Sequence, residues 1–224
     1  MRLGSLLKTP ALPAVDAGSI VAPSTFQINM LEPQAVDGNV SLYELFVINA
    51  LVAQQAPLRI FEFGTFNGRT TLNLAANSPA DARIFTLDLP RAHDTAHALQ
   101  PLEQKYADKP SSGDMFAGRP EAAKITQLYG DSARFDFAPY LESMDFVFVD
   151  ASHAYDYVLN DSRIALRLLR KGTGTILWHD YGRPQWWPGV TKALHELRAE
   201  SPAFQSLQQI EGTSLAYLPG RRPS

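Results

Sequence analysis

The sequence predicts an α/β fold whose doubly wound, mostly parallel sheet of seven strands ends in an antiparallel hairpin. Two observations lead to this prediction. From residue 40 to residue 200, short apolar runs alternate with segments of helical periodicity, which is the pattern of strand–helix–strand units. The last two apolar runs, 204–210 and 214–219, are separated only by Glu-Gly-Thr, so they are expected to pair as a hairpin.

Each element follows from a local pattern. The first helix is expected at 40–55, where apolar residues recur near the helical period and Ala56-Pro57 stops them. Short apolar runs predict the strands of the sheet at 58–63, 83–88, 123–129, 144–150 and 174–180. Helices are expected between and after them at 69–77, 156–170 and 188–200, with any helix of the polar stretch after the second strand confined to 92–107.

A single domain is expected to contain most of the chain. The 224 residues, 45% of them hydrophobic, can bury one substantial core at 40–219. Residues 1–39 contain several prolines and no sustained period, so they are expected to form an irregular arm. The polar stretch 90–121 is expected to be a lid or insertion loop, and 220–224 a disordered tail.

The composition narrows the classes of partner. The 20 Lys and Arg residues against 23 Asp and Glu residues give a net charge of −3, which favours a small molecule over a nucleic acid or an anionic membrane. There is no cysteine, so disulfides and thiolate metal ligands are excluded. Neither a signal-peptide pattern nor a run of roughly 20 apolar residues is present, so a soluble cytoplasmic protein is expected. The apolar helix at 40–55 leaves a homo-oligomer open.

The most informative stretch is RIFEFGTFNGRTTLNL at 59–74. A strand ends near the acidic Glu62, a turn carries Gly64 and Gly68, and a helix follows. Glycines in such a turn let a ligand approach the backbone at the carboxyl edge of a sheet. The spacing differs from the G-x-G-x-x-G of dinucleotide sites, and the carboxylate suits a ligand with an ammonium group better than a pyrophosphate. A tight strand-to-helix connection without a ligand is the alternative.

Acidic residues also end the next two strands. Asp88 lies 20 residues after Gly68, the spacing of a carboxylate that accepts hydrogen bonds from ribose hydroxyls, but it could instead cap the turn before Pro90. Asp131 and Ser132 come shortly after the following strand, where they could meet an adenine edge or cap a helix.

In their order along the chain, these segments resemble the class I S-adenosylmethionine-dependent methyltransferases, which have a Rossmann-like fold. The segments are EFGTFNGRTT, IFTLDLP, YGDS, MDFVFVDASHAYDYVLND, GTGTILWHDY and EGTSLAYLP. Within that class, the V-D-x-x-H-x-Y segment and the later His-Asp pair are most similar to a group of small-molecule O-methyltransferases. The resemblance covers residues 40–219 except for 90–121, and it does not include 1–39.

The resemblance implies roles for several residues. The amino-acid end of S-adenosylmethionine would face Glu62, Gly64, Thr65 and Gly68. Asp88 would hold the ribose, Asp131 and Ser132 would border the adenine, and Asp150 would lie beside the cofactor. The implied reaction is methyl transfer to a hydroxyl of a small molecule such as a sugar or a natural product.

Methyl transfer requires the acceptor oxygen to lie in line with the methyl group and to lose its proton. Asp150 and His153 follow one strand and His179 and Asp180 the next, so these four groups are expected to meet at one edge of the sheet. In one mechanism, Asp150, His179 and Asp180 bind magnesium or manganese, which lowers the pKa of the acceptor hydroxyl. In the other, His153 is a general base without metal, although it could also be a packing residue.

Other readings remain open at this point. Metal-dependent relatives place Asp or Glu before the final Asp, where this sequence has His179. Trp186 and Trp187 would line an acceptor pocket or pack against the sheet edge. One alternative function is an NAD-dependent oxidoreductase, which the glycine spacing and Glu62 disfavour. The other is a catalytically inactive, cofactor-binding partner protein.

Overall fold

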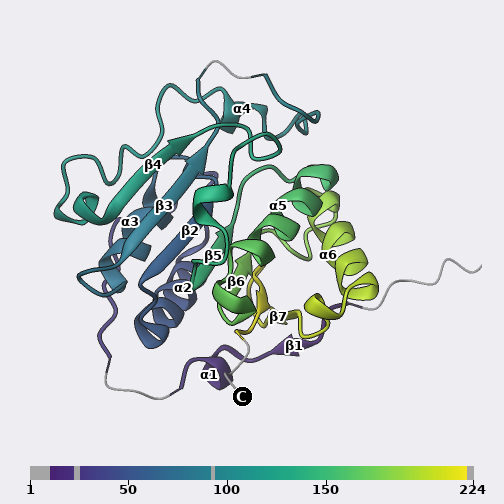
Figure 1. Ribbon diagram of the computed structural model, residues 1–224, viewed down its shortest axis with the longest axis horizontal. Coiled ribbons are helices and arrows are strands. Elements are labelled where there is room, and N and C mark those ends of the chain that lie inside the picture. Colours follow the sequence, from purple (N-terminus) through teal and green to yellow (C-terminus); the bar gives the residue numbers. More distant parts are fainter. Residues whose placement is uncertain (1–10, 23–25, 92–93, 221–224) are drawn as a thin grey trace, which may run out of the picture.

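The computed structural model describes residues 11–22, 26–91 and 94–220. In this part of the chain one eight-stranded sheet has the order β1-β7-β8-β6-β5-β2-β3-β4 (Figure 1). Its strands are β1 Ala14–Val15, β2 Arg59–Phe63, β3 Arg83–Asp88, β4 Ile125–Tyr129, β5 Phe146–Val149, β6 Thr175–Trp178, β7 Gln208–Ile210 and β8 Ala216–Leu218. The helices are α1 Ala17–Ile20, α2 Leu42–Gln55, α3 Arg69–Asn77, α4 Gln104–Ala107, α5 Tyr155–Leu168 and α6 Pro188–Glu200.

The predicted doubly wound sheet and its C-terminal hairpin are confirmed. Strands β4, β3, β2, β5 and β6 run parallel, whereas β8 pairs antiparallel with both β6 and β7. The direction in which strands are added reverses between β2 and β5, because β3 and β4 lie on one side of β2 and β5 and β6 on the other. Sheets of this kind bind ligands at the carboxyl ends of the strands near such a reversal.

The described sheet has one strand more than the seven predicted. The arm contributes β1, which pairs in parallel with β7 and brings Ala14 beside Gln209. The amide of Gln209 also donates to the carbonyl oxygen of Pro13. A strand of two residues is too short to show an alternating pattern, so the sequence predicts only an irregular arm there. Residues 221–224 of the predicted tail lie outside the described residues.

The stretch 90–121 forms less helix than its sequence permits. Between residues 94 and 121 the α-helical part is the single turn α4, which is followed by a 3-10 turn that begins at Pro120. Pro101 and Pro110 bracket α4 and limit its length, because proline lacks the amide proton that a helix interior needs. The rest of this stretch is held by contacts with distant parts of the chain.

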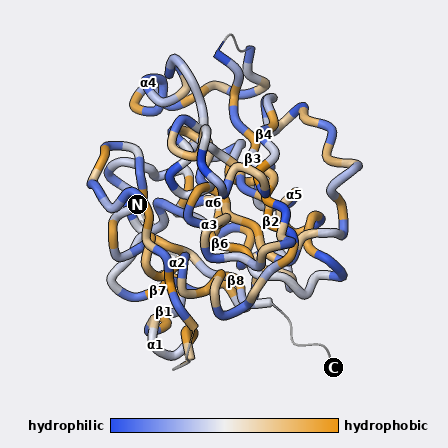
Figure 2. Tube along the Cα trace, turned by 90° about the vertical axis from the view of Figure 1, so that its left-hand side faces the viewer, coloured by the Kyte–Doolittle hydropathy of each residue, from blue (hydrophilic) through white to orange (hydrophobic). Residues whose placement is uncertain are grey.

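Two helical layers cover the two faces of the sheet. Helices α5 and α6 pack with Phe61, Phe63 and Trp178, whereas α2 and α3 pack with Ile60 and Phe148 on the other face. This division follows from the pleat of the strands, since successive side chains point to opposite faces. Figure 2 shows the apolar segments concentrated in the interior of the molecule. Among the helices of the described residues, none combines the length and apolar character needed to span a bilayer.

The turn between β2 and α3 depends on Gly64. Its φ of 90° is in the left-handed region, and a Cβ built there would lie 2.0 Å from the carbonyl oxygen of Asp150. The backbone at the end of β5 therefore presses directly against this turn. Any side chain at position 64 would meet backbone atoms, which cannot rotate away.

Replacing Gly64 with alanine is therefore expected to destabilise the protein severely. Gly64→Ala should lower the free energy of unfolding by more than about 3 kcal/mol, because β2 and β5 must separate to admit the methyl group. Gly118→Ala is the matched control, since Gly118 has a φ of 74° but open space around its Cβ position. It should cost only about 1 kcal/mol. Urea unfolding of both variants measures the difference. Equal losses of unfolding free energy would contradict the predicted clash between a Cβ at position 64 and the carbonyl oxygen of Asp150.

Candidate functional site

The carboxyl ends of the five parallel strands surround one cavity of about 550 Å³. Gly64 follows β2, Asp88 ends β3, Asp150 follows β5, and His179 and Asp180 follow β6. Eight of the predicted site residues line this cavity: Gly64, Asp88, Asp131, Ser132, Asp150, His153, His179 and Asp180. The predicted meeting of the residues after β5 and β6 is thus observed.

Glu62, Thr65 and Gly68 lie behind the cavity wall and do not line it. Glu62 is fully buried, and its Oε2 accepts hydrogen bonds from the hydroxyls of Thr71 and Thr86. The hydroxyl of Thr65 also bonds that of Thr86, at 2.7 Å. A Cβ at Gly68 would point into the 90–121 loop at Phe116, so this glycine serves the packing of the loop in the present structure.

Burial makes Glu62 a neutral group at neutral pH. Removal from water raises its pKa to about 8, and the nearby charges of Asp150 and Asp88 act in the same direction, against the two threonine hydroxyls. A protonated Glu62 does not supply the negative charge that the sequence suggests for an ammonium-bearing ligand. Its carboxyl group instead ties together β2, β3 and α3.

At the other strand ends, Asp88 is held by both its own turn and the 90–121 loop. Its Oδ2 accepts hydrogen bonds from the amide of Phe66 at 2.9 Å and the hydroxyl of Ser112 at 2.8 Å. Its Oδ1 accepts one from Lys109 Nζ at 2.9 Å, and both side chains are about 90% buried, since 9% and 10% of them are exposed. The loop therefore places a cation on the carboxylate that is predicted to hold a ribose.

Asp131 both lines the cavity and caps a turn, so the two readings of this residue are compatible. Its carboxylate accepts hydrogen bonds from the amides of Ala96, at 2.6 Å, and Ala133, at 2.9 Å. The neighbouring Ser132 lines the same wall, and its carbonyl oxygen accepts a bond from Asn160 in α5.

His153 is clamped between two carboxylates. Its Nδ1 lies 3.0 Å from Glu103 of the loop, and its Nε2 lies 2.8 Å from Asp180. Burial disfavours the charged ring, but the hydrogen bonds to Asp180 and Glu103 outweigh it and raise the pKa of His153 to about 9. Trp187 stacks on the ring at 4.0 Å. In this arrangement both nitrogens carry protons, so a role as general base would require one carboxylate contact to be lost.

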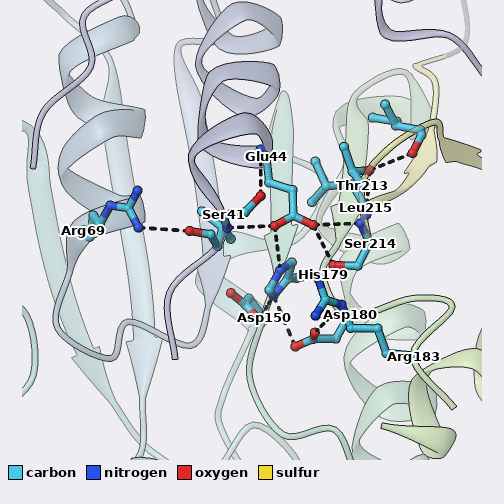
Figure 3. Close-up of polar contacts among 12 residues, drawn as sticks. Ser41, Glu44, Arg69, Asp150, His179, Asp180, Arg183, Thr213, Ser214 and Leu215 are labelled. Carbon is cyan, nitrogen blue, oxygen red and sulfur yellow. Dashed lines mark hydrogen bonds and ion pairs between the residues drawn. The ribbon is translucent and has the colours of Figure 1, made fainter. Parts of the chain in front are cut away.

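His179 lies at the centre of a second cluster (Figure 3). Its Nδ1 is 3.1 Å from Asp150 and 3.2 Å from Asp180, and its Nε2 is 3.4 Å from Glu44 of α2. Burial works against the imidazolium, yet the charges of Asp150 and Asp180 raise the pKa of His179 well above its ordinary value. Although burial opposes ionisation of Glu44, hydrogen bonds from His179 and Ser214 hold its pKa well below the usual range.

Asp150, His179 and Asp180 are also the cluster that could hold a cation. One ligand atom from each lies within 4.8 Å of the others. Asp180 has a φ of 60°, an unusual left-handed conformation that aspartate tolerates and that aims its carboxylate into the cluster. Two carboxylates and an imidazole suit a divalent transition metal better than magnesium, which prefers oxygen ligands.

Several polar residues of the cavity wall were missed by the sequence reasoning, and three of them pair with predicted site residues. Glu44, Glu103 and Lys109 all line the cavity. A signal existed for Glu44, because Ser41 and Glu44 have the S-x-x-E spacing of a capping box and form one at the start of α2. No local pattern marks Glu103 or Lys109, since their partners lie 50 and 21 residues away along the chain.

Comparison with known proteins identifies the family of this chain. A family model described as a methyltransferase domain matches residues 61–181, more than half of the chain. No curated protein sequence matches the chain.

Solved structures of low sequence identity share the fold of this chain. The O-methyltransferase TomG from Streptomyces achromogenes, involved in tomaymycin synthesis and crystallised with SAM, is 19% identical with a TM-score of 0.56 over 85% of this chain and 93% of its own. Cofactor-bound Rv0187 from MTB is 20% identical, with a TM-score of 0.60 over 85% of each chain. An O-methyltransferase from Bacillus cereus in complex with SAH is 20% identical, with a TM-score of 0.55 over 81% of this chain and 82% of its own.

The raised pKa of Glu62 predicts a pH-dependent stability. Protonated Glu62 adds to the free energy of unfolding, and this stabilisation is fully present below the unfolded-state pKa of about 4.5. It is lost as the pH rises towards about 8. Glu62→Gln cannot ionise, so its stability relative to the wild type should increase across this window, by up to about 1.4 kcal/mol per pH unit.

Urea unfolding at several pH values measures this effect. Glu211→Gln is the control, because Glu211 is an exposed glutamate of the hairpin turn. Parallel stability curves for the wild type and Glu62→Gln would show that Glu62 ionises at the same pH in the folded and unfolded states.

Proposed function

The chain belongs to the methyltransferase domain family, and on this premise we propose that it transfers a methyl group from S-adenosylmethionine to a hydroxyl of a small molecule. The observation that carries the proposal is the continuity of the cavity. Asp88 and Asp131 line one part of it, and His153, Asp180 and Trp187 line another. A cofactor and an acceptor can therefore meet within one continuous cavity.

The strand ends provide a place for each part of the cofactor. Asp88 would accept hydrogen bonds from the ribose hydroxyls, Asp131 and Ser132 would border the adenine, and Gly64 would let the ligand approach the backbone. The solved structures of similar fold that were obtained with SAM or SAH support this assignment. The family match favours methyl transfer over the alternative of an oxidoreductase.

The ionisable cluster suits the transfer step. The acceptor oxygen forms a bond to the methyl carbon, the carbon–sulfur bond breaks, and the hydroxyl proton passes to a carboxylate. We assign that proton to Asp180, which faces the cavity and is oriented by His153 and His179. Trp186 and Trp187 give the acceptor part of the cavity flat apolar walls.

A divalent cation would fit the same cluster. Asp150, His179 and Asp180 would hold it, with His179 as neutral imidazole. The chemistry that such an ion supplies is a lower pKa for the acceptor hydroxyl. The surplus of carboxylates favours added positive charge here. The four carboxylates face two imidazoles and the guanidinium of Arg183; they belong to Glu44, Glu103, Asp150 and Asp180.

Cofactor binding is tested by thermal unfolding with S-adenosylhomocysteine. At 100 times its dissociation constant the ligand should stabilise the protein by about 2.7 kcal/mol, which corresponds to a rise of about 5–11 °C in Tm. Asp88→Asn should lose most of this shift, because a carboxamide accepts ribose hydrogen bonds more weakly than a carboxylate. Asp81→Asn, an exposed control, should keep it. The absence of a shift in the wild type would overturn the proposed cofactor.

Catalysis is tested by Asp180→Asn in a methyl-transfer assay on hydroxylated small molecules. Loss of the proton acceptor should reduce kcat by about 10²- to 10⁴-fold. Binding of S-adenosylhomocysteine should change little, because Asp88 and Asp131 are intact. A variant with unchanged kcat would exclude Asp180 as the proton acceptor. Parallel assays with EDTA and with added Mn²⁺ or Mg²⁺ report whether a cation takes part.

A further inference from the structure

Glu103 is a buried carboxylate that the polar stretch 90–121 places on the His153 side of the cavity. It lines the cavity, yet only 5% of the residue is exposed. Its Oε2 accepts a hydrogen bond from the amide of His153 at 2.7 Å and lies 3.0 Å from Nδ1 of the same residue. Its Oε1 accepts bonds from the hydroxyl of Ser152 at 2.7 Å and the amide of Gln100 at 2.9 Å. Burying a carboxylate is costly, and these donors offset that cost.

The contact with Glu103 fixes which nitrogen of His153 carries a proton. Burial opposes ionisation of Glu103, but hydrogen bonds from the ring and the amide of His153 hold its pKa below the ordinary value. An ionised carboxylate has only acceptor atoms, so Nδ1 must be the donor in this contact. The other nitrogen, Nε2, then faces Asp180, whose Oδ2 lies 2.8 Å away.

The imidazole of His153 is also restrained on its face and along its backbone. Trp187 stacks on the ring, with the centroids 4.0 Å apart and an angle of 20° between the planes. Such a stack admits two orientations of the imidazole that differ by a half turn, and Glu103 selects the one that presents Nε2 to Asp180. Gln100 adds to this hold, because its Nε2 donates to the carbonyl oxygen of His153 at 2.8 Å. The stretch 90–121 therefore binds both backbone polar groups of this histidine.

We infer that Glu103 is a positioning residue for methyl transfer, because it holds His153 in the orientation in which Nε2 fixes the carboxylate of Asp180. This inference rests on the proposed function, in which Asp180 accepts the proton of the acceptor hydroxyl. Glu103 acts through the imidazole and not on the acceptor. The stretch 90–121 thus takes part in the reaction as well as covering the cavity.

A double-mutant cycle tests whether Glu103 acts through His153. The wild type, Glu103→Met, His153→Phe and the double variant are compared in methyl-transfer assays with catechol, glycerol and methyl glucoside as hydroxylated probes. Methionine has no carboxylate oxygens, whereas phenylalanine keeps the stack on Trp187 and lacks both nitrogens. Asp108→Asn is the matched control, because Asp108 is an exposed acidic residue at the end of α4 in the same stretch.

Glu103→Met should lower kcat by about 10- to 100-fold, the range for loss of a carboxylate that orients an imidazole. Its KM for S-adenosylmethionine should stay within about twofold of the wild type, because Asp88 and Asp131 are intact. In the His153→Phe background the same change should lower kcat by less than about twofold, since the imidazole is already absent. Glu103→Gln keeps one acceptor oxygen and should lose less activity, and Asp108→Asn should match the wild type.

The ring nitrogens of His153 provide a readout that needs no acceptor. Nitrogen NMR spectra are recorded for the wild type and Glu103→Met in complex with S-adenosylhomocysteine. Nδ1 should carry a proton in the wild type, and loss of its carboxylate partner should shift the resonances of both nitrogens. Binding of S-adenosylhomocysteine also shows that the variant is folded.

The two hypotheses fail in different ways. If the wild type does not bind S-adenosylhomocysteine, the proposed cofactor and this inference both fall. If it binds and the His153 resonances are the same in Glu103→Met, the positioning role is overturned and the proposed function stands. Equal losses of kcat with and without the His153 imidazole would show that Glu103 only anchors the stretch 90–121, which would also overturn the inference.

Discussion

The contact on which the site depends is the approach of the Asp150 carbonyl oxygen to the glycine turn after β2. Phe63 and Val149 are paired at the ends of adjacent parallel strands, so the two chains leave the sheet side by side. Because Gly64 has no Cβ, its backbone can lie in direct contact with that of Asp150. The same contact brings Asp150 to the glycine turn and places the residues that follow β6 one strand farther on. Strand pairing and ligand access thus depend on one glycine.

Burial alone does not decide which carboxyl groups of the interior are charged. Glu62 and Glu44 are both almost fully buried, but the pKa of Glu62 is raised and that of Glu44 is lowered. Glu62 has only hydroxyl donors, whereas Glu44 has the imidazole of His179 and two donors from Ser214. Negative charge therefore gathers on the side of the cavity where His153 and His179 lie. Arg69 is buried at the start of α3, and among the described residues its Nε and Nη2 have no hydrogen-bond partner.

The sequence predicts the sheet and the strand-end residues well, because both depend on local patterns. Helices α3 and α6 and strand β3 begin and end where the pattern indicates, and Asp88, Asp150 and Asp180 line the cavity as strand-end residues should. The sequence predicts poorly those side-chain contacts that depend on long-range packing. The orientation of Glu62 towards Thr71 follows from how α3 lies on the sheet. The contacts of Glu103 and Lys109 follow from the path of a loop without periodicity.

The pairing of Lys109 with Asp88 has a consequence for how a ligand enters and leaves. If Asp88 holds the ribose as proposed, an incoming cofactor would compete with the ammonium group of Lys109. This group is tethered to the same chain, so the effective concentration of the ammonium group is high at every ligand concentration. The measured binding free energy would then be that of the ligand's own contacts less that of the contacts that the loop loses. In the proposed reaction, the ammonium group of Lys109 would re-form its ion pair with Asp88 as the product of the cofactor dissociates. A loop that weakens binding in this way would also shorten the residence time of the product.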